Sequence, residues 1–173
     1  MKRLVTVLLL GMTVLATSAG EAKWYYDLAQ AQAIAGKENK LVFMDFTGSD
    51  WCGWCMKIKK EVFSTPEFND YARSRLVLVE VDLPRAKPLS IETLITNTQL
   101  QERFKAEGFP TIIVLNGKGT ELWRIGGYAP MTTADWIGLL EQLRLHPGSV
   151  PSGSAPVAPM AAPKPADSQP AKS

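Results

Sequence analysis

Two cysteines separated by two residues are the feature of this sequence best suited to chemistry. They are the only cysteines in the chain and lie in Trp51-Cys52-Gly53-Trp54-Cys55, between an apolar run and a predicted helix. At the N-terminus of a helix, unpaired backbone N–H groups and the helix dipole stabilise a thiolate and lower its pKa. Cys55, one turn further along, is placed to attack a mixed disulfide formed at Cys52. The pair therefore predicts thiol–disulfide exchange, with Cys52 as the nucleophile and Cys55 as the resolving thiol.

Three other roles compete with exchange at these cysteines. A zinc site would need two further ligands, and the only histidine, His146, lies at the far end of the last predicted helix. A structural disulfide across two residues would close a very small loop and stabilise the fold little. Inert buried thiols fit poorly in a chain whose N-terminus marks it for export, where thiols oxidise. We therefore expect no metal site and no bound cofactor, since the dithiol itself carries two electrons.

A proline forms the second candidate element of the site. Gly108 ends a predicted helix and Thr111 begins a predicted strand, so Pro110 lies at a tight entry into that strand. The base rate alone favours a trans bond before Pro110, because only about 5% of X–Pro bonds are cis.

Aromatic residues flank both elements. Trp51, Trp54 and Phe109 are candidates for an apolar contact surface around Cys52, because exposed aromatic side chains are typical interface anchors. The alternative for Trp51 is packing into the core beside the motif. For Trp54, we favour the contact surface.

The elements that position these residues can be predicted from apolar spacing and capping signals. Helices are predicted over 27–37, 52–62, 64–71, 98–108 and 132–143. Capping signals begin three of them, at Ser64 with Glu67, Thr98 with Gln101, and Thr132 with Asp135. Strands are predicted over 41–46, 76–81, 111–115 and 121–125, the last two joined by a hairpin at Asn116-Gly117. This order predicts an α/β fold with a mixed sheet, whose parallel crossovers come first and whose antiparallel hairpin comes late.

The two ends of the chain differ from its middle. Residues 1–19 have the basic start, apolar core and small-residue end of a signal peptide, with cleavage after Ala19 or Ala22. An uncleaved membrane anchor is the alternative. Residues 147–173 are rich in proline, alanine and serine, which predicts an extended tail that serves as a spacer or is inert. Residues 23–146 remain as one predicted domain.

The charge of the chain excludes a class of partner. The formal net charge is +2, and 46% of the residues are hydrophobic, as in an ordinary globular protein. This balance argues against a nucleic-acid binder, which would need a concentrated basic face. Lys2 and Arg3 lie in the predicted signal peptide, so the mature protein would have 17 basic and 17 acidic residues.

These motifs resemble those of the thioredoxin-fold thiol–disulfide oxidoreductases. The cysteine motif is similar to that family's Trp-Cys-Gly-x-Cys site, Phe109-Pro110-Thr111 to its cis-proline loop, and Gly126-Gly127 to its late glycine bend. The resemblance covers about residues 24–146. Within the family, the stretch from Lys40 to Phe68 is similar to exported thioredoxin-like proteins and to the C-terminal domain of the transmembrane thiol–disulfide interchange proteins, especially at Glu61-Val62-Phe63 and Pro66-Glu67-Phe68.

The resemblance implies a thioredoxin fold, with a central mixed sheet flanked by helices. It also implies a cis bond before Pro110, which would lie against the cysteines, and a Phe109 backbone that hydrogen-bonds an extended substrate segment. The substrate-contacting residues would be Trp51, Gly53, Trp54, Phe109 and Pro110.

Three departures from the family pattern bear on mechanism. Trp54 replaces the usual proline, so the direction of electron flow stays open, with the reductase direction favoured. Asp45 resembles the family's buried proton acceptor, but the spacing from it to the motif is one residue longer than usual. Asp45 is therefore either a proton relay or a hydrogen-bonded structural aspartate, and Asp50 is a candidate helix cap. The segment 83–97 is also longer than the family core requires and is a candidate for shaping partner choice.

Together these features predict a periplasmic or secreted oxidoreductase of the protein-disulfide reductase or isomerase type. Its partners would be protein thiols and disulfides, with a membrane electron donor or oxidant protein as a further candidate, and no nucleic acid. The alternative is a non-catalytic thioredoxin-fold binding module of the cell envelope.

Overall fold

The computed structural model describes residues 20–153. The predicted signal peptide, 1–19, and most of the predicted tail lie outside the described residues. The strands are β1 (Trp24–Tyr25), β2 (Leu41–Thr47), β3 (Leu76–Asp82), β4 (Thr111–Leu115) and β5 (Glu121–Gly126). The helices are α1 (Leu28–Glu38), α2 (Gly53–Ile58), the π-helical turn η1 (Lys59–Phe63), α3 (Pro66–Arg75), α4 (Ile91–Phe104) and α5 (Thr133–Leu145).

The five strands form one mixed sheet in the order β1-β3-β2-β4-β5. β3 is parallel to both β1 and β2, whereas β4 is antiparallel to β2 and to β5. The α/β class and the late antiparallel hairpin predicted from the sequence are confirmed. The short edge strand β1 was not predicted, because two residues give no alternation to recognise.

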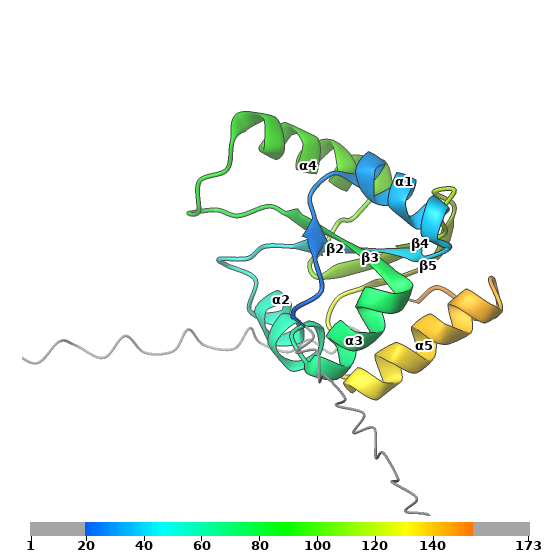
Figure 1. The fold of residues 1–173 in the computed structure, drawn as a ribbon. Helices are drawn as coiled ribbons and strands as arrows, with labels where there is room; N and C mark the ends of the chain where they lie inside the picture. The colour runs from blue at the N-terminus through cyan, green and yellow to red at the C-terminus, as the bar shows by residue number, and fades with distance from the viewer. Residues whose placement is uncertain (1–19, 154–173) are drawn as a thin grey trace, which may run out of the picture.

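Helices cover both faces of the sheet, as Figure 1 shows, with α1 and α4 on one side and α2, α3 and α5 on the other. Both faces of the central strands are therefore buried, and every residue of β2 and β3 is inaccessible or nearly so. Phe43 packs with Ile58 and Trp136 in one core, while Met44 and Phe46 pack with α1 and α4 in the other. Because side chains alternate along a strand, Asp45 points to the same face as Phe43, beneath α2.

Two predicted helix starts are wrong. The cap of α3 is Thr65 rather than Ser64: its hydroxyl accepts from the N–H of Phe68, and the helix continues past residue 71 to Arg75. α4 begins at Ile91 rather than Thr98, because Ser90 caps it by accepting from the N–H of Thr93. The first two turns of α4 thus occupy residues 91–97 of the segment 83–97, which is longer than the family core requires.

Within residues 20–153, no helix combines the length and the apolar character needed to cross a bilayer. The last helix, α5, has the predicted capping box: Thr132 accepts from the N–H of Asp135, whose carboxylate accepts from the N–H of Thr132. Trp136, Leu140 and Leu143 of this helix are buried, and Ile137 is half-buried.

Candidate active site

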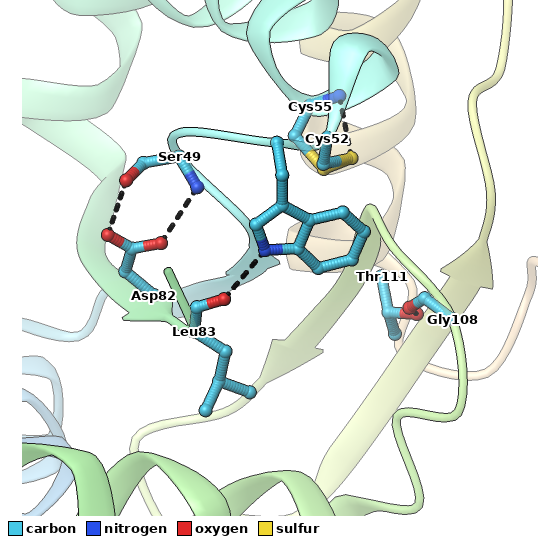
Figure 2. The surroundings of a disulfide bond; sticks show 8 residues. Ser49, Cys52, Cys55, Asp82, Leu83, Gly108 and Thr111 are labelled. Carbon is cyan, nitrogen blue, oxygen red and sulfur yellow. Dashed lines mark hydrogen bonds between the residues drawn. A yellow bond between two sulfur atoms is a disulfide. The ribbon is translucent and has the colours of Figure 1, made fainter. Parts of the chain in front are cut away.

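The two cysteines form a disulfide at the start of α2, directly after β2, as Figure 2 shows. Their Cα atoms are 5.3 Å apart. Cys52 is the N-cap residue of α2, and its Sγ accepts a hydrogen bond of 3.2 Å from the N–H of Cys55. Cys52 is 6% exposed and Cys55 is 2% exposed. The sulfur of Cys52 is therefore held where a backbone N–H would stabilise negative charge on it.

The extra residue before the motif lies in a turn and leaves the strand regular. β2 pairs with β3 in unbroken register up to Thr47, and the turn then closes through the N–H of Cys52, which donates to the carbonyl of Gly48 at 2.9 Å. Asp82, at the end of β3, accepts from both the N–H and the hydroxyl of Ser49, at 2.8 and 2.6 Å (Figure 2). The ends of two neighbouring strands thus fix the approach to the cysteines.

Asp50 does not cap α2, as the sequence suggested it could, because Cys52 is the N-cap residue. Its carboxylate accepts from three successive backbone N–H groups, those of Arg85, Ala86 and Lys87, at distances from 2.7 to 3.2 Å. These hydrogen bonds lower the pKa of Asp50 below its ordinary value. Asp50 therefore anchors the loop between β3 and α4 beside the redox motif.

Trp51 lies between two segments that are distant in sequence. Its Nε1 donates to the carbonyl of Leu83 at 2.8 Å, and the guanidinium carbon of Arg85 lies 4.0 Å from its ring centroid. The ring of Phe109 meets it edge-on, with the centroids 5.5 Å apart. Trp51 is thus half-buried and fixed beside the motif, and its role in contacting a substrate stays a prediction.

Pro110 and its neighbours lie at the start of β4, beside the end of β2. The Phe109–Pro110 peptide bond is cis, as the family resemblance implied, and Pro110 is buried. The carbonyl of Pro110 accepts from the N–H of Gly127 at 2.7 Å, and the hydroxyl of Thr111 donates to the carbonyl of Gly108 at 2.6 Å. The glycine bend after β5 is therefore joined directly to the proline loop.

Asp45 is a buried carboxyl in a charged cluster under α2. It is 1% exposed, and its Oδ1 accepts no hydrogen bond from any of the described residues. Glu80 is its partner on β3, and Lys59 donates from Nζ to the Oε2 of Glu80 at 2.6 Å. Burial raises the pKa of Asp45 from 3.8 to about 7. The negative charges of Glu80 and Asp82 add to this rise, and the positive charge of Lys59 opposes it.

Sequence reasoning missed several members of this arrangement. Lys59 is one of three closely spaced lysines after the motif, and nothing in that pattern indicates a buried partner. For Glu80, the only available signal is its position as a charged residue inside an otherwise apolar predicted strand. Tyr128 was also missed, although its ring stacks on Trp54 with the centroids 4.7 Å apart. Gly53 and Trp54 are both half-buried at the surface beside the disulfide.

A metal centre is not suggested by the described part of the chain. No group of three or more His, Cys, Asp or Glu side chains within residues 20–153 is arranged to hold a metal ion. The arrangement is suited instead to chemistry at the sulfurs: a disulfide at a helix start, a neighbouring acid of raised pKa, and an aromatic border.

Comparison with known sequences places the chain among redox proteins. A family model described as a thioredoxin-like domain matches residues 28–143. The disulfide bond reductase DsbH of Chlamydia pneumoniae is 32% identical over 109 residues, which cover 63% of this chain and 65% of that protein. The thioredoxin-related protein DsbJ of the same organism is 30% identical over 136 residues, covering 75% of this chain and 39% of that protein. The chain thus spans less than two thirds of the length of these curated relatives.

Solved structures give the same result for the fold. The structure of a DsbH oxidoreductase superposes with a TM-score of 0.69 at 26% identity, covering 84% of this chain and 94% of that one. A thioredoxin from Thermus thermophilus superposes with a TM-score of 0.55 at 21% identity, covering 75% and 92%. The thioredoxin fold predicted from the sequence is confirmed.

Proposed function

The chain belongs to the thioredoxin-like domain family, and we propose that it is a thiol–disulfide oxidoreductase that exchanges disulfides with protein substrates through Cys52 and Cys55. The observation that carries this proposal is the Cys52–Cys55 disulfide at the start of α2, with the Sγ of Cys52 accepting from a backbone N–H. That contact favours the thiolate of Cys52 in the reduced protein, so Cys52 rather than Cys55 attacks a substrate disulfide. For the same reason Cys52 is the better leaving group when the Cys52–Cys55 disulfide is itself attacked.

In the reductase direction, the reduced protein is the attacking species. The Cys52 thiolate attacks one sulfur of a substrate disulfide, so that a mixed disulfide forms and the first substrate thiolate leaves. The Cys55 thiolate then attacks the Sγ of Cys52, which closes the observed disulfide and releases the second substrate thiolate. Two electrons pass from the dithiol to the substrate. An electron donor must afterwards reduce the Cys52–Cys55 disulfide, and a membrane protein of the thiol–disulfide interchange type is our candidate.

Asp45 is proposed as the group that takes the proton from Cys55. It lies on the sheet face covered by α2, and a pKa raised to about 7 lets it hold or release a proton near neutral pH. The substrate contacts proposed are Trp51, Trp54 and the Phe109–Pro110 loop. Residues 23–146 would act as one domain, and export through the predicted signal peptide would place it in the periplasm or outside the cell, where disulfides persist.

The reductase direction is favoured by the similarity to a protein named as a disulfide bond reductase. The test of the function is turnover of insulin disulfides by the wild type and by Cys52→Ser. The wild type should reduce insulin and the variant should not, since it lacks the attacking sulfur. Undiminished turnover by Cys52→Ser would contradict the proposal, and an inactive wild type would favour the non-catalytic binding module. An equilibrium reduction potential near about −270 mV would support the reductase direction, and one near about −120 mV would indicate an oxidant.

A further inference from the structure

The bend after β5 brings one aromatic side chain directly against the redox motif. The ring of Tyr128 stacks on that of Trp54, with the ring planes 29° apart and the centroids separated by 4.7 Å. Trp54 lies between the two cysteines and is half-buried, so one of its faces is covered by Tyr128 while part of the ring stays exposed. The position of the motif's own aromatic ring therefore depends on a residue from a distant part of the chain.

Tyr128 is itself fixed from two directions. Its hydroxyl donates to the Oε2 of Glu61 at 3.1 Å, and Glu61 in turn pairs with the Nζ of Lys57 at 3.0 Å. That Nζ also lies 5.7 Å from the centroid of the Tyr128 ring, within the range of a cation–π contact. On the backbone side, the preceding residue, Gly127, donates to the carbonyl of Pro110. Tyr128 thus connects α2, η1 and the proline loop.

The stack of Trp54 on Tyr128 is one of two aromatic pairs around the disulfide. The other joins Trp51 to Phe109, with the centroids 5.5 Å apart. Each pair combines a tryptophan of the motif with an aromatic residue from a loop that lies far along the chain. Both tryptophans are consequently held in place before any partner binds.

We propose that Tyr128 is a positioning residue for protein substrates: it holds the Trp54 ring in one place and so provides a preformed contact for apolar side chains that flank a substrate cysteine. This inference rests on the thiol–disulfide exchange proposed above. A preformed contact binds more tightly than a mobile one, because less side-chain freedom is lost on binding. Small disulfides bring no flanking side chains and gain nothing from it. Tyr128 therefore favours protein disulfides over small-molecule disulfides.

The experiment compares two substrates, a peptide disulfide with apolar residues beside its cysteines and hydroxyethyl disulfide. In Tyr128→Ala, the KM for the peptide should rise by about 2- to 12-fold, the range expected for the loss of one aromatic stack. The kcat and the rate with hydroxyethyl disulfide should stay as in the wild type. Tyr128→Phe keeps the ring but loses the hydroxyl bond to Glu61, so its KM should lie between those of the wild type and Tyr128→Ala. Tyr26→Ala, which removes a tyrosine that is 60% exposed and lies outside this cluster, is the matched control and should change neither substrate.

A double variant tests whether Tyr128 acts through Trp54. If it does, adding Tyr128→Ala to Trp54→Ala should produce no further rise in the KM for the peptide. An unchanged KM in Tyr128→Ala, an equal loss with both disulfides, or additive effects in the double variant would each overturn the inference while leaving the proposed function intact. A wild-type protein that reduces neither substrate would overturn the proposed function, and the inference with it.

Discussion

Replacing Asp45 by asparagine is expected to stabilise the oxidised protein at neutral and alkaline pH. The side chain is 1% exposed, and one of its oxygens accepts no hydrogen bond from the described residues, so the ionised form lacks the contacts that would offset its burial. Asparagine has nearly the same shape and carries no charge at any pH. Asp45→Asn therefore removes the cost of the buried charge and leaves the packing beneath α2 in place.

The size of the effect follows from the pKa. Burial, with the charges of Glu80 and Asp82, raises the pKa of Asp45 from 3.8 to about 7. Between these values the folded protein keeps the proton that the unfolded chain has lost, so the stability of the wild type falls as pH rises. The slope is about 1.4 kcal/mol per pH unit, and the accumulated loss above about pH 7 is about 4 kcal/mol. Below about pH 4 the wild type and Asp45→Asn should differ little.

The assay is equilibrium unfolding in guanidinium chloride from about pH 4 to about pH 9, with the Cys52–Cys55 disulfide kept intact so that no thiol titrates. The free energy of unfolding of Asp45→Asn minus that of the wild type should grow with pH and level off above about pH 7. Asp70→Asn is the control, because Asp70 is exposed on α3, and its curve should follow that of the wild type. A difference for Asp45→Asn that is equal at about pH 5 and about pH 8 would refute the reasoning, since Asp45 would then not retain its proton in the fold.

Three other substitutions test the contacts and the packing that hold the site and the fold. Asp50→Ala removes the acceptor for three backbone N–H groups of residues 85–87, so trypsin should cut after Arg85 several-fold faster than in the wild type, as followed by mass spectrometry. An unchanged cleavage rate would show that Asp50 does not order the loop. Gly117→Ala would place a Cβ 2.8 Å from the Cα of Gly36, so thermal unfolding should show a loss of about 1–3 kcal/mol. Gly138→Ala, in α5 with no atom within 4 Å of the added Cβ, should instead gain up to about 1 kcal/mol, and equal effects of the two would contradict this packing argument.

The parts of the site that the sequence predicted are those specified by short-range signals. The cysteine motif, the helix that follows it and the strand before it lie within one short stretch, and capping and apolar spacing identify them locally. Pro110 was found through its place between a helix end and a strand start. Its cis bond followed from the family resemblance, because the dipeptide Phe109-Pro110 carries no local signal for it.

The start of α4 shows why local signals can mislead. Its buried residues, Asn97, Leu100 and Phe104, begin only at the end of the second turn, whereas Ile91 at the start of the helix is 79% exposed. Ile91, Leu94 and Ile95 recur at helical spacing in the first two turns, but all three side chains are exposed, so this spacing does not mark a face packed in the core. Ser90 begins the helix by a hydroxyl–backbone contact that differs from the Ser/Thr-x-x-Glu/Gln pattern used for prediction.

Contacts between distant segments could not be predicted in the same way. Lys59 pairs with Glu80 only because α2 and η1 lie over β3, and Trp54 stacks on Tyr128 only because the bend after β5 returns to the motif. Neither pair has a spacing in the sequence that indicates contact. These pairs set the electrostatics under the site and the shape of its surface, so the sequence predicts the reacting atoms better than it predicts their tuning.

Two departures from the family pattern, the extra residue before the motif and the long segment after β3, are physically coupled. The extra residue lies in a turn in which Gly48 is required, because a Cβ there would be 2.4 Å from the Trp51 ring. In this turn Cys52 takes the helix cap, which leaves the Asp50 carboxylate to bind the N–H groups of residues 85–87. These hydrogen bonds join the turn before the motif to the segment after β3. The combined result is a loop held beside the disulfide, with the Arg85 guanidinium against the ring of Trp51.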